Sequence, residues 1–139
     1  MKQSQTWLMA PILMTVLFAS SGNASAGVVA IVNNANTTAD KSTIAKLYTL
    51  ETKSWPDGAQ AKLYDSSDQS EREAFCQAYT GKSAGAVKSI WAKAVFTGRA
   101  VPPRVFDSDV DVTNEVAKDK NAVGYVDESN VTGSVRVVR

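Results

Sequence analysis

The chain has 139 residues, with 15 basic and 14 acidic side chains, no histidine and a single cysteine, Cys76. Without histidine the chain holds neither a Ser-His-Asp nor a Cys-His nucleophile, and no zinc site that uses an imidazole. One cysteine excludes an intramolecular disulfide. The near-neutral charge, with no basic run that is interleaved with aromatic residues, argues against nucleic acid as a partner. We therefore expect a protein that is not an enzyme and uses no cofactor.

The first 26 residues have the pattern of a secretory signal peptide. Lys2 supplies the positive start, residues 7–19 are apolar, and residues 24–26, Ala-Ser-Ala, fit a small-residue cleavage site. The apolar run is shorter than the roughly 20 residues that cross a bilayer, although a retained membrane anchor is the alternative. The sequence thus predicts a signal peptide over residues 1–26, one domain over residues 27–139, and a periplasmic location.

The predicted domain begins with a strand and a helix. Residues 27–33, GVVAIVN, are a continuous β-branched run, which is typical of a strand that is buried on both faces. Residues 33–36, Asn-Asn-Ala-Asn, then favour a turn. Asp40 or Ser42 is expected to cap a helix over residues 43–50.

A second strand and helix follow a Pro-Asp-Gly turn. Residues 61–65, AKLYD, predict the strand. Ser70 and Glu73 have the spacing of a capping box, in which Ser70 is the N-cap. The helix is expected to run to about residue 79, and Gly81 stands just past its end, where a left-handed residue is favoured.

Two more helices and two more strands complete the predicted domain. Ser83 is expected to cap a helix that closes at Thr97-Gly98, and the prolines of residues 101–103 require extended backbone. Residues 107–109 offer caps for a helix to about residue 118. The last strands are expected at residues 121–126 and 134–138. Strands and helices therefore alternate, which predicts an α/β fold with a partly parallel sheet.

The junction between the second strand and its helix is the first candidate binding site. Ser66, Ser67, Gln69, Ser70 and Arg72 crowd the point at which a helix begins. Backbone N–H groups there have no partner within the helix and attract anions. These residues are therefore predicted to bind an oxyanion, the alternative being turn residues, a helix cap and surface ion pairs.

Asn33 and Asn34, at the end of the first strand, are the next best polar lining. Open α/β sheets bind ligands outside the carboxyl ends of their strands. A plain turn is the alternative interpretation of these asparagines. Residues 107–111 contain three aspartates, but they lack the glycine and the distal glutamate of a calcium loop, so no metal site is predicted.

The order of several motifs resembles one known family. The motifs are VVAIVNNAN, TIAKLYTLETKSWPDG, EREAF, IWAKAVFTGRAVPP and NAVGYVDES. Together they resemble the phosphate-binding-protein-like domain of bacterial ABC importers, over residues 28–138. The resemblance implies a single lobe of a periplasmic-binding-protein-like fold, with a mixed, mostly parallel sheet flanked by helices. Family members have two such lobes and hold an anion between them.

The resemblance also places the phosphate loop of the family on residues 65–71. Asp65 then stands where the family has an arginine, residues 68–70 replace a Gly-Ser-Gly, and Glu71 replaces a threonine. Arg72 matches a residue that commonly follows the motif. Close to an anion, each added carboxylate costs on the order of one to a few kcal/mol. The exposed helix N-terminus returns only about 0.3–1 kcal/mol, so the sequence predicts weak affinity.

The predicted function is therefore that of a periplasmic solute-binding-like protein with weak binding of an oxyanion, inorganic phosphate being the class of ligand. A membrane permease or a periplasmic protein is the partner that the resemblance implies, and a homodimer would restore the cleft that one lobe lacks. The alternative is a non-transport module for protein interaction, built on one binding-protein lobe.

Overall fold

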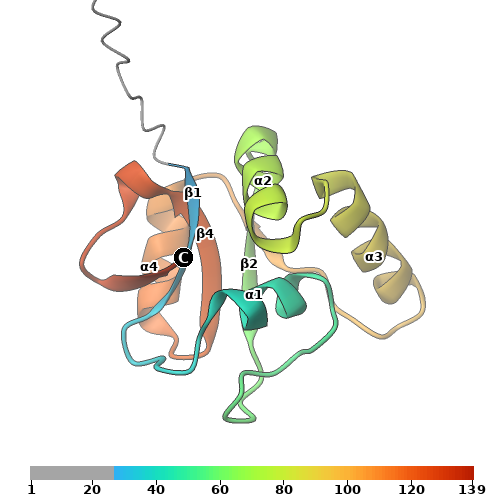
Figure 1. Ribbon diagram of the computed structural model, residues 1–139, viewed down its shortest axis with the longest axis horizontal. Coiled ribbons are helices and arrows are strands. Elements are labelled where there is room, and N and C mark those ends of the chain that lie inside the picture. The colour runs from blue at the N-terminus through green and yellow to red at the C-terminus, as the bar shows by residue number, and fades with distance from the viewer. Residues whose placement is uncertain (1–26) are drawn as a thin grey trace, which may run out of the picture.

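The computed structural model describes residues 27–139, and the predicted signal peptide lies outside the described residues. Within the described range, no helix combines the length and the apolar character needed to cross a bilayer. Residues 27–139 form one five-stranded sheet with helices on both faces (Figure 1). The predicted α/β class is confirmed.

Strands and helices alternate along the chain, as predicted. The strands are β1 (Val28–Asn33), β2 (Lys62–Ser66), β3 (Arg104–Phe106), β4 (Ala122–Asp127) and β5 (Val135–Val138). The helices are α1 (Lys41–Tyr48), α2 (Gln69–Phe75), α3 (Ala84–Phe96) and α4 (Asp109–Lys118). A π-helical turn, η1 (Cys76–Thr80), continues α2, and a 3₁₀ turn, η2 (Glu128–Asn130), follows β4. The short strand β3, which directly follows the two prolines, was not predicted.

The order of strands in the sheet is β3-β2-β4-β1-β5. Strand β2 runs parallel to β3 and β4, whereas β1 runs antiparallel to β4 and β5. The sheet is mixed as predicted, but two of these four pairings are parallel rather than most of them. Because β1 and β2 run in opposite directions, the carboxyl end of β1 and the carboxyl end of β2 lie at opposite ends of the strands of the sheet.

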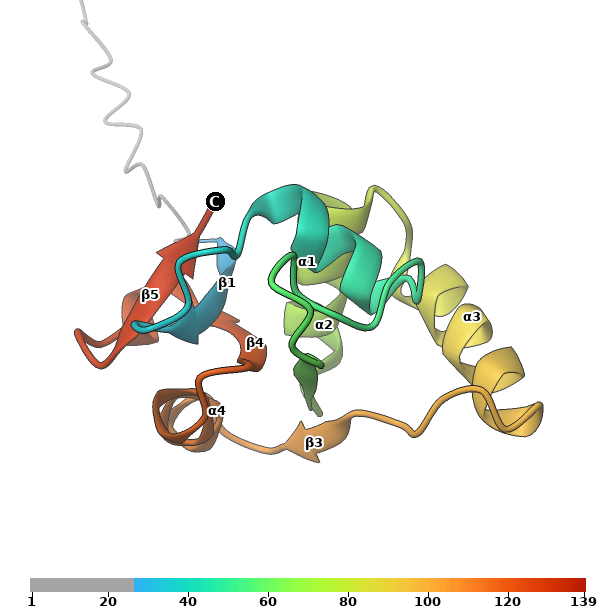
Figure 2. The same cartoon turned by 90° about the horizontal axis from the view of Figure 1, so that it is seen from below.

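Helices α1 and α2 cover one face of the sheet and α4 covers the other (Figure 2). Strand β4 contributes apolar side chains to the core on each face of the sheet. Val123 and Tyr125 belong to the core under α1 and α2, whereas Ala122 and Val126 belong to the core under α4. Alternate side chains of a strand point to opposite faces, so a nearly continuous apolar run is what a strand covered on both sides requires.

Gly124 allows α4 to approach the sheet closely. A Cβ atom at this position would lie 2.5 Å from Cγ1 of Val112 and 3.4 Å from Cγ2 of Val116, both on α4. The first distance is well inside the contact distance of two carbon atoms, about 3.5–4.0 Å. The glycine of the Gly-Tyr-Val motif is therefore required by helix–sheet packing.

Helix α3 is packed much less closely than the other helices. It lies on the opposite side of the molecule from α4 (Figures 1 and 2), and Val87 is its one buried residue. Phe96, at its carboxyl end, is 92% exposed. Ile90, Trp91 and Val95 recur with a helical period, as the residues of a buried face do, but Val95 is exposed because nothing in residues 27–139 covers that part of α3.

Candidate functional site

Helix α2 begins two residues earlier than predicted. Asp68 is the N-cap of α2, because its Oδ1 accepts a hydrogen bond from the backbone N–H of Glu71 at 3.0 Å. The prediction that Ser70 caps this helix is wrong. Asp68 to Glu71 has the same spacing as Ser70 to Glu73, so the capping-box pattern fits two registers. The hydroxyl of Ser66 accepts a hydrogen bond from the N–H of Asp68 at 3.1 Å. This bond fixes the register in which Asp68 is the cap.

Strands β2 and β4 separate just before this turn, and two tyrosines fill the gap. The strands pair only through Lys62 and Leu63. Beyond them, the hydroxyl of Tyr48 donates to the carbonyl of Tyr64 at 2.7 Å. The hydroxyl of Tyr125 accepts from the N–H of Ser66 at 3.1 Å. Buried backbone groups that lost their strand partner are thereby satisfied, as they must be.

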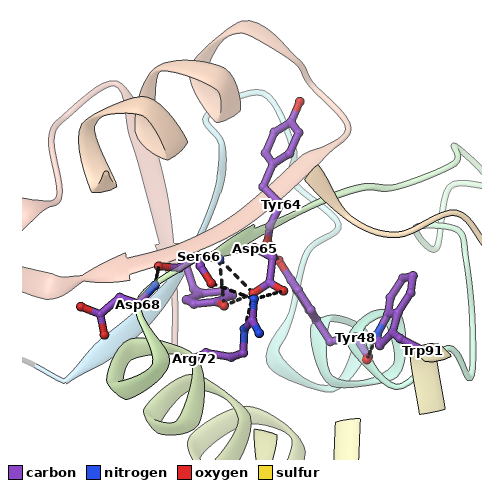
Figure 3. A network of polar contacts seen from close by, with 8 residues as sticks. Tyr48, Tyr64, Asp65, Ser66, Asp68, Arg72 and Trp91 are labelled. Atoms are coloured by element: carbon purple, nitrogen blue, oxygen red, sulfur yellow. Dashed lines mark hydrogen bonds and ion pairs between the residues drawn. The ribbon is translucent and has the colours of Figure 1, made fainter. Parts of the chain in front are cut away.

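Asp65 lies at the centre of the junction, which we define as residues 65–72. Its carboxylate accepts a hydrogen bond from the hydroxyl of Tyr125 and forms an ion pair with Arg72, in which Nη2 lies 3.0 Å from Oδ2. Nη2 of Arg72 also donates to the carbonyl of Ser66 at 2.9 Å (Figure 3). The side chains of Arg72 and Asp65 are only 19% and 23% exposed. The guanidinium at the junction therefore already holds an anion, and that anion is Asp65.

The electrostatics of the junction follow from this pairing. Burial opposes the charge of Arg72, but Asp65 and Tyr125 outweigh it and raise the pKa of Arg72 above its ordinary value. Burial, and then the charge of Asp65, raise the pKa of Tyr125 far above its usual range. Tyr125 thus stays protonated and donates to Asp65 at every physiological pH.

Acidic side chains crowd the amino end of α2. Burial, then a hydrogen bond to Asp109, and then the charges of Asp109, Asp68 and Asp127 raise the pKa of Glu71 to about 8. Oε1 of Glu71 is buried and has no hydrogen-bond partner among the described residues. Protonation of Glu71, which its raised pKa favours, avoids a buried charge at this point. No group of acidic or cysteine side chains within residues 27–139 has the arrangement of a metal site.

The seven predicted binding residues fall into two separate places. Ser66 is buried, and its hydroxyl supports the turn; Ser67, Gln69 and Ser70 are exposed around the amino end of α2. Asn33 and Asn34 lie at the opposite edge of the sheet. Two carbonyls at the end of α4, those of Val116 and Ala117, accept from Nδ2 of Asn33, and Nδ2 of Asn34 donates to Gly133. The structure therefore does not bring the asparagines to the junction.

A small cavity of about 90 Å³ lies beside Asp65 and Arg72. Its lining includes a second cation, Lys88 of α3, together with Trp91 and Cys76. Sequence analysis missed Lys88, because an exposed lysine on a helix carries no local signal of a site. Burial raises the pKa of the Cys76 thiol to about 11, so this cysteine is a core residue rather than a nucleophile.

Solved structures share this fold. A phosphate ABC transporter substrate-binding protein from Clostridium perfringens, solved with bound phosphate, matches 81% of this chain and 44% of its own, with 21% sequence identity and a TM-score of 0.61. An ABC-type phosphate transport receptor from Vibrio cholerae matches 81% of this chain and 45% of its own, with 16% identity and a TM-score of 0.56. No protein-family model matches the sequence, and no curated protein matches it.

These comparisons establish the fold and its extent. The chain has the architecture of one lobe of a phosphate ABC transporter substrate-binding protein, as the sequence motifs predicted. It spans less than half the length of these two structures. At such low identity, a shared fold does not show that the ligand is also shared. Any binding has to be inferred from the residues at the junction.

Proposed function

We propose that the protein is a non-catalytic solute-binding-type lobe that acts in the periplasm and binds an oxyanion weakly at the β2–α2 junction. Inorganic phosphate is the ligand class that the fold favours. The observation that carries this proposal is the guanidinium of Arg72, which reaches back from α2 to the carbonyl of Ser66 and so places a cation at the turn between a parallel strand and a helix. Such a place favours anions by both charge and backbone N–H groups.

Weak affinity follows from the same geometry. An incoming oxyanion competes with Asp65 for the guanidinium, and it meets Asp68 at the helix cap. Ser67, Gln69 and Ser70 are exposed and free of the turn's own hydrogen bonds, so they are the side chains left to receive it. Millimolar affinity corresponds to only about 4 kcal/mol of binding free energy, which a partly neutralised site of this kind supports.

The periplasmic location rests on residues 1–26. Strand β1 begins at Val28, so cleavage after Ala26 removes nothing from the sheet. Amino-terminal sequencing of the protein recovered from a periplasmic extract is expected to start at Gly27. A protein that starts at Met1 and sediments with membranes would instead support the retained anchor.

Calorimetry with phosphate and with sulfate tests the binding proposal. The wild-type protein is expected to bind with a dissociation constant in the millimolar range. Asp65→Asn keeps the shape of the side chain and its bond from Tyr125 but frees the guanidinium, so phosphate affinity is expected to rise about tenfold.

Asp57→Asn is the matched control for this experiment. It removes the same charge from the exposed turn before β2, away from Arg72, and is expected to leave phosphate affinity unchanged. An equal gain in both variants would indicate a general charge effect. If neither wild type nor Asp65→Asn releases heat at millimolar phosphate or sulfate, the binding proposal is wrong.

A module for protein interaction is the second candidate function. Four exposed apolar side chains lie in α3 and in the chain that follows it through β3, namely Val95, Phe96, Val101 and Val105. Exposed apolar groups in one region mark interaction surfaces. In-cell photocrosslinking from position 96 should then yield one discrete adduct, and the same probe at exposed Ala35 should not. Equal labelling from both positions would count against this candidate.

A further inference from the structure

A second cavity, larger than the one beside Arg72, lies away from the junction. It has a volume of about 390 Å³ and lies between the end of α1, the first half of β2, and α3 with the segment that leads to β3. We call it the α3 pocket, and define it by Leu50, Lys53, Leu63, Trp91, Arg99 and Pro102. It shares only Trp91 and Pro103 with the small cavity beside Arg72. Its volume falls within the range of about 300–1,000 Å³ that is usual for small-molecule sites.

Part of the wall of the α3 pocket is apolar and rigid. Nε1 of Trp91 donates to the carbonyl of Tyr48 at 2.7 Å, which fixes the indole at the pocket wall. Pro102 and Pro103 hold the opposite segment in extended backbone, since proline restricts its own φ and the residue before it. These groups offer a fixed surface for an apolar body, and they lose little conformational entropy when one binds.

Leu50 adds a strained position to this wall. It has a φ of 60° and is the one non-glycine residue within 27–139 with a positive φ. The position follows the end of α1, where glycine is the residue that adopts this conformation without strain. A residue other than glycine in a left-handed conformation is strained, and such positions cluster at functional sites; Leu50 is one of the residues that line the pocket.

The charges around the pocket have one sign. Lys53, Lys62, Arg99 and Arg104 line it, and no aspartate or glutamate does. Lys62 and Arg104 have acidic partners in Asp119 and Glu115. Lys53 and Arg99 form no ion pair within the described part of the chain. The ammonium of Lys53 instead donates to the backbone carbonyl of Arg99, which ties the two sides of the pocket together.

We propose that the α3 pocket binds a small organic anion. The apolar part of this anion packs against Trp91 and Leu50. Its charged group, a carboxylate, sulfonate or phosphate ester, is neutralised by Lys53 and Arg99. Inorganic phosphate gains nothing from the apolar part of the wall, because it has no apolar surface to remove from water. A second copy of the chain fits less well, because a two-fold contact at this face brings the same cations together.

Fluorescence titration with the probe 8-anilinonaphthalene-1-sulfonate, an aromatic anion, tests the proposal. Wild type is expected to show saturable binding. The double variant Lys53→Gln, Arg99→Gln is expected to weaken it about three- to tenfold, as the loss of two partly screened charges requires. Leu50→Asn tolerates the left-handed backbone but removes the apolar wall, and it is expected to weaken binding as well. Circular dichroism verifies that each variant is folded.

Two controls separate the pocket from other apolar surface. Phe96→Ser removes an aromatic group that is 92% exposed and does not line the pocket, and it is expected to leave the titration unchanged. The uncharged probe N-phenyl-1-naphthylamine is expected to bind wild type and the double charge variant alike. All variants share residues 1–26, so any contribution of that segment cancels in the comparison.

Three results would overturn the proposal: an unchanged titration in the double variant, an equal loss in Phe96→Ser, or a dimer by sedimentation that Lys53→Gln, Arg99→Gln dissociates. The double variant is also expected to bind inorganic phosphate as wild type does. A failure of the α3 pocket therefore leaves the test at the junction unaffected, and a failure at the junction leaves this one unaffected.

Discussion

The β2–α2 junction and the α3 pocket both contain cations, but the groups around these cations differ. At the junction, Arg72 is half-buried and paired with Asp65, and further carboxylates surround it. At the pocket, Lys53 and Arg99 are exposed and face apolar walls without an acid. The comparison suggests that charge at the junction stabilises the fold, whereas charge at the pocket is available to a ligand.

The largest expected effect is on the ion pair at the junction. Asp65→Ala is expected to lower the free energy of unfolding by about 2–3 kcal/mol, because it leaves Arg72 and the hydroxyl of Tyr125 without their acceptor. Urea denaturation measures the change. Arg99→Ala is the matched charge deletion at the pocket and is expected to stay within about 0.5 kcal/mol of wild type. Similar losses in both variants would remove the distinction between the two regions.

A smaller loss is expected when one hydroxyl is deleted at the gap between β2 and β4. Tyr125→Phe keeps the stacked ring but removes the hydroxyl that donates to Asp65 and accepts from the N–H of Ser66. The N–H of Ser66 keeps Oδ1 of Asp65 as an acceptor, so we expect a cost of about 1–2 kcal/mol, mainly from the half-buried carboxylate that loses a donor. Thermal and urea unfolding measure it. Tyr64→Phe is the control, because Tyr64 points away from the network (Figure 3) and is expected to be nearly neutral. An equal loss in the control would mean that the tyrosine network contributes nothing specific.

The smallest expected effect is a dependence of stability on pH. Folded Glu71, with its pKa raised from 4.5 to about 8, keeps a proton that the unfolded chain releases. Its stabilisation is therefore complete below 4.5 and is lost as the pH rises through 8. Because the carboxyl is partly exposed, we expect a decrease on the order of only 1 kcal/mol.

Melting temperatures between pH 5 and pH 9 measure this dependence, and Glu71→Gln is expected to flatten it. The carboxyls with lowered pKa values, Asp40, Asp119 and Asp127 among them, titrate below this window. A wild-type stability that rises from pH 5 to pH 8 would contradict the assignment of the proton to Glu71.

Much of the fold was predictable from local pattern. The β-branched run of β1 indicated a strand that is covered on both faces, and Ala30 and Ile31 do lie in opposite cores. Ser83 caps α3 as expected, and Gly81 has the predicted left-handed conformation, with a φ of 68°. These features depend on neighbouring residues alone, which is why a single sequence reveals them.

The candidate site was predictable only in part. The loop of residues 65–72 and its acidic character were evident from the sequence, and so was the alternative that its charged residues form ion pairs with one another. The choice between Asp68 and Ser70 as the cap was not, because two equal spacings compete. Asn33 and Asn34 were grouped with the loop because strand ends often meet at one edge, but β1 turned out to run against β2.

The sequence by itself determined the α/β pattern, the resemblance to one binding-protein lobe, and an acidic loop where an anion site is expected. Only the tertiary structure decided which charges meet. It placed Tyr125 and Arg72, 53 positions apart in the chain, on the carboxylate of Asp65, and it left Lys53 and Arg99 beside an apolar cavity without an acid. The physical reason is that charge pairing depends on distances of a few ångströms across strands and helices, which spacing along the chain does not encode.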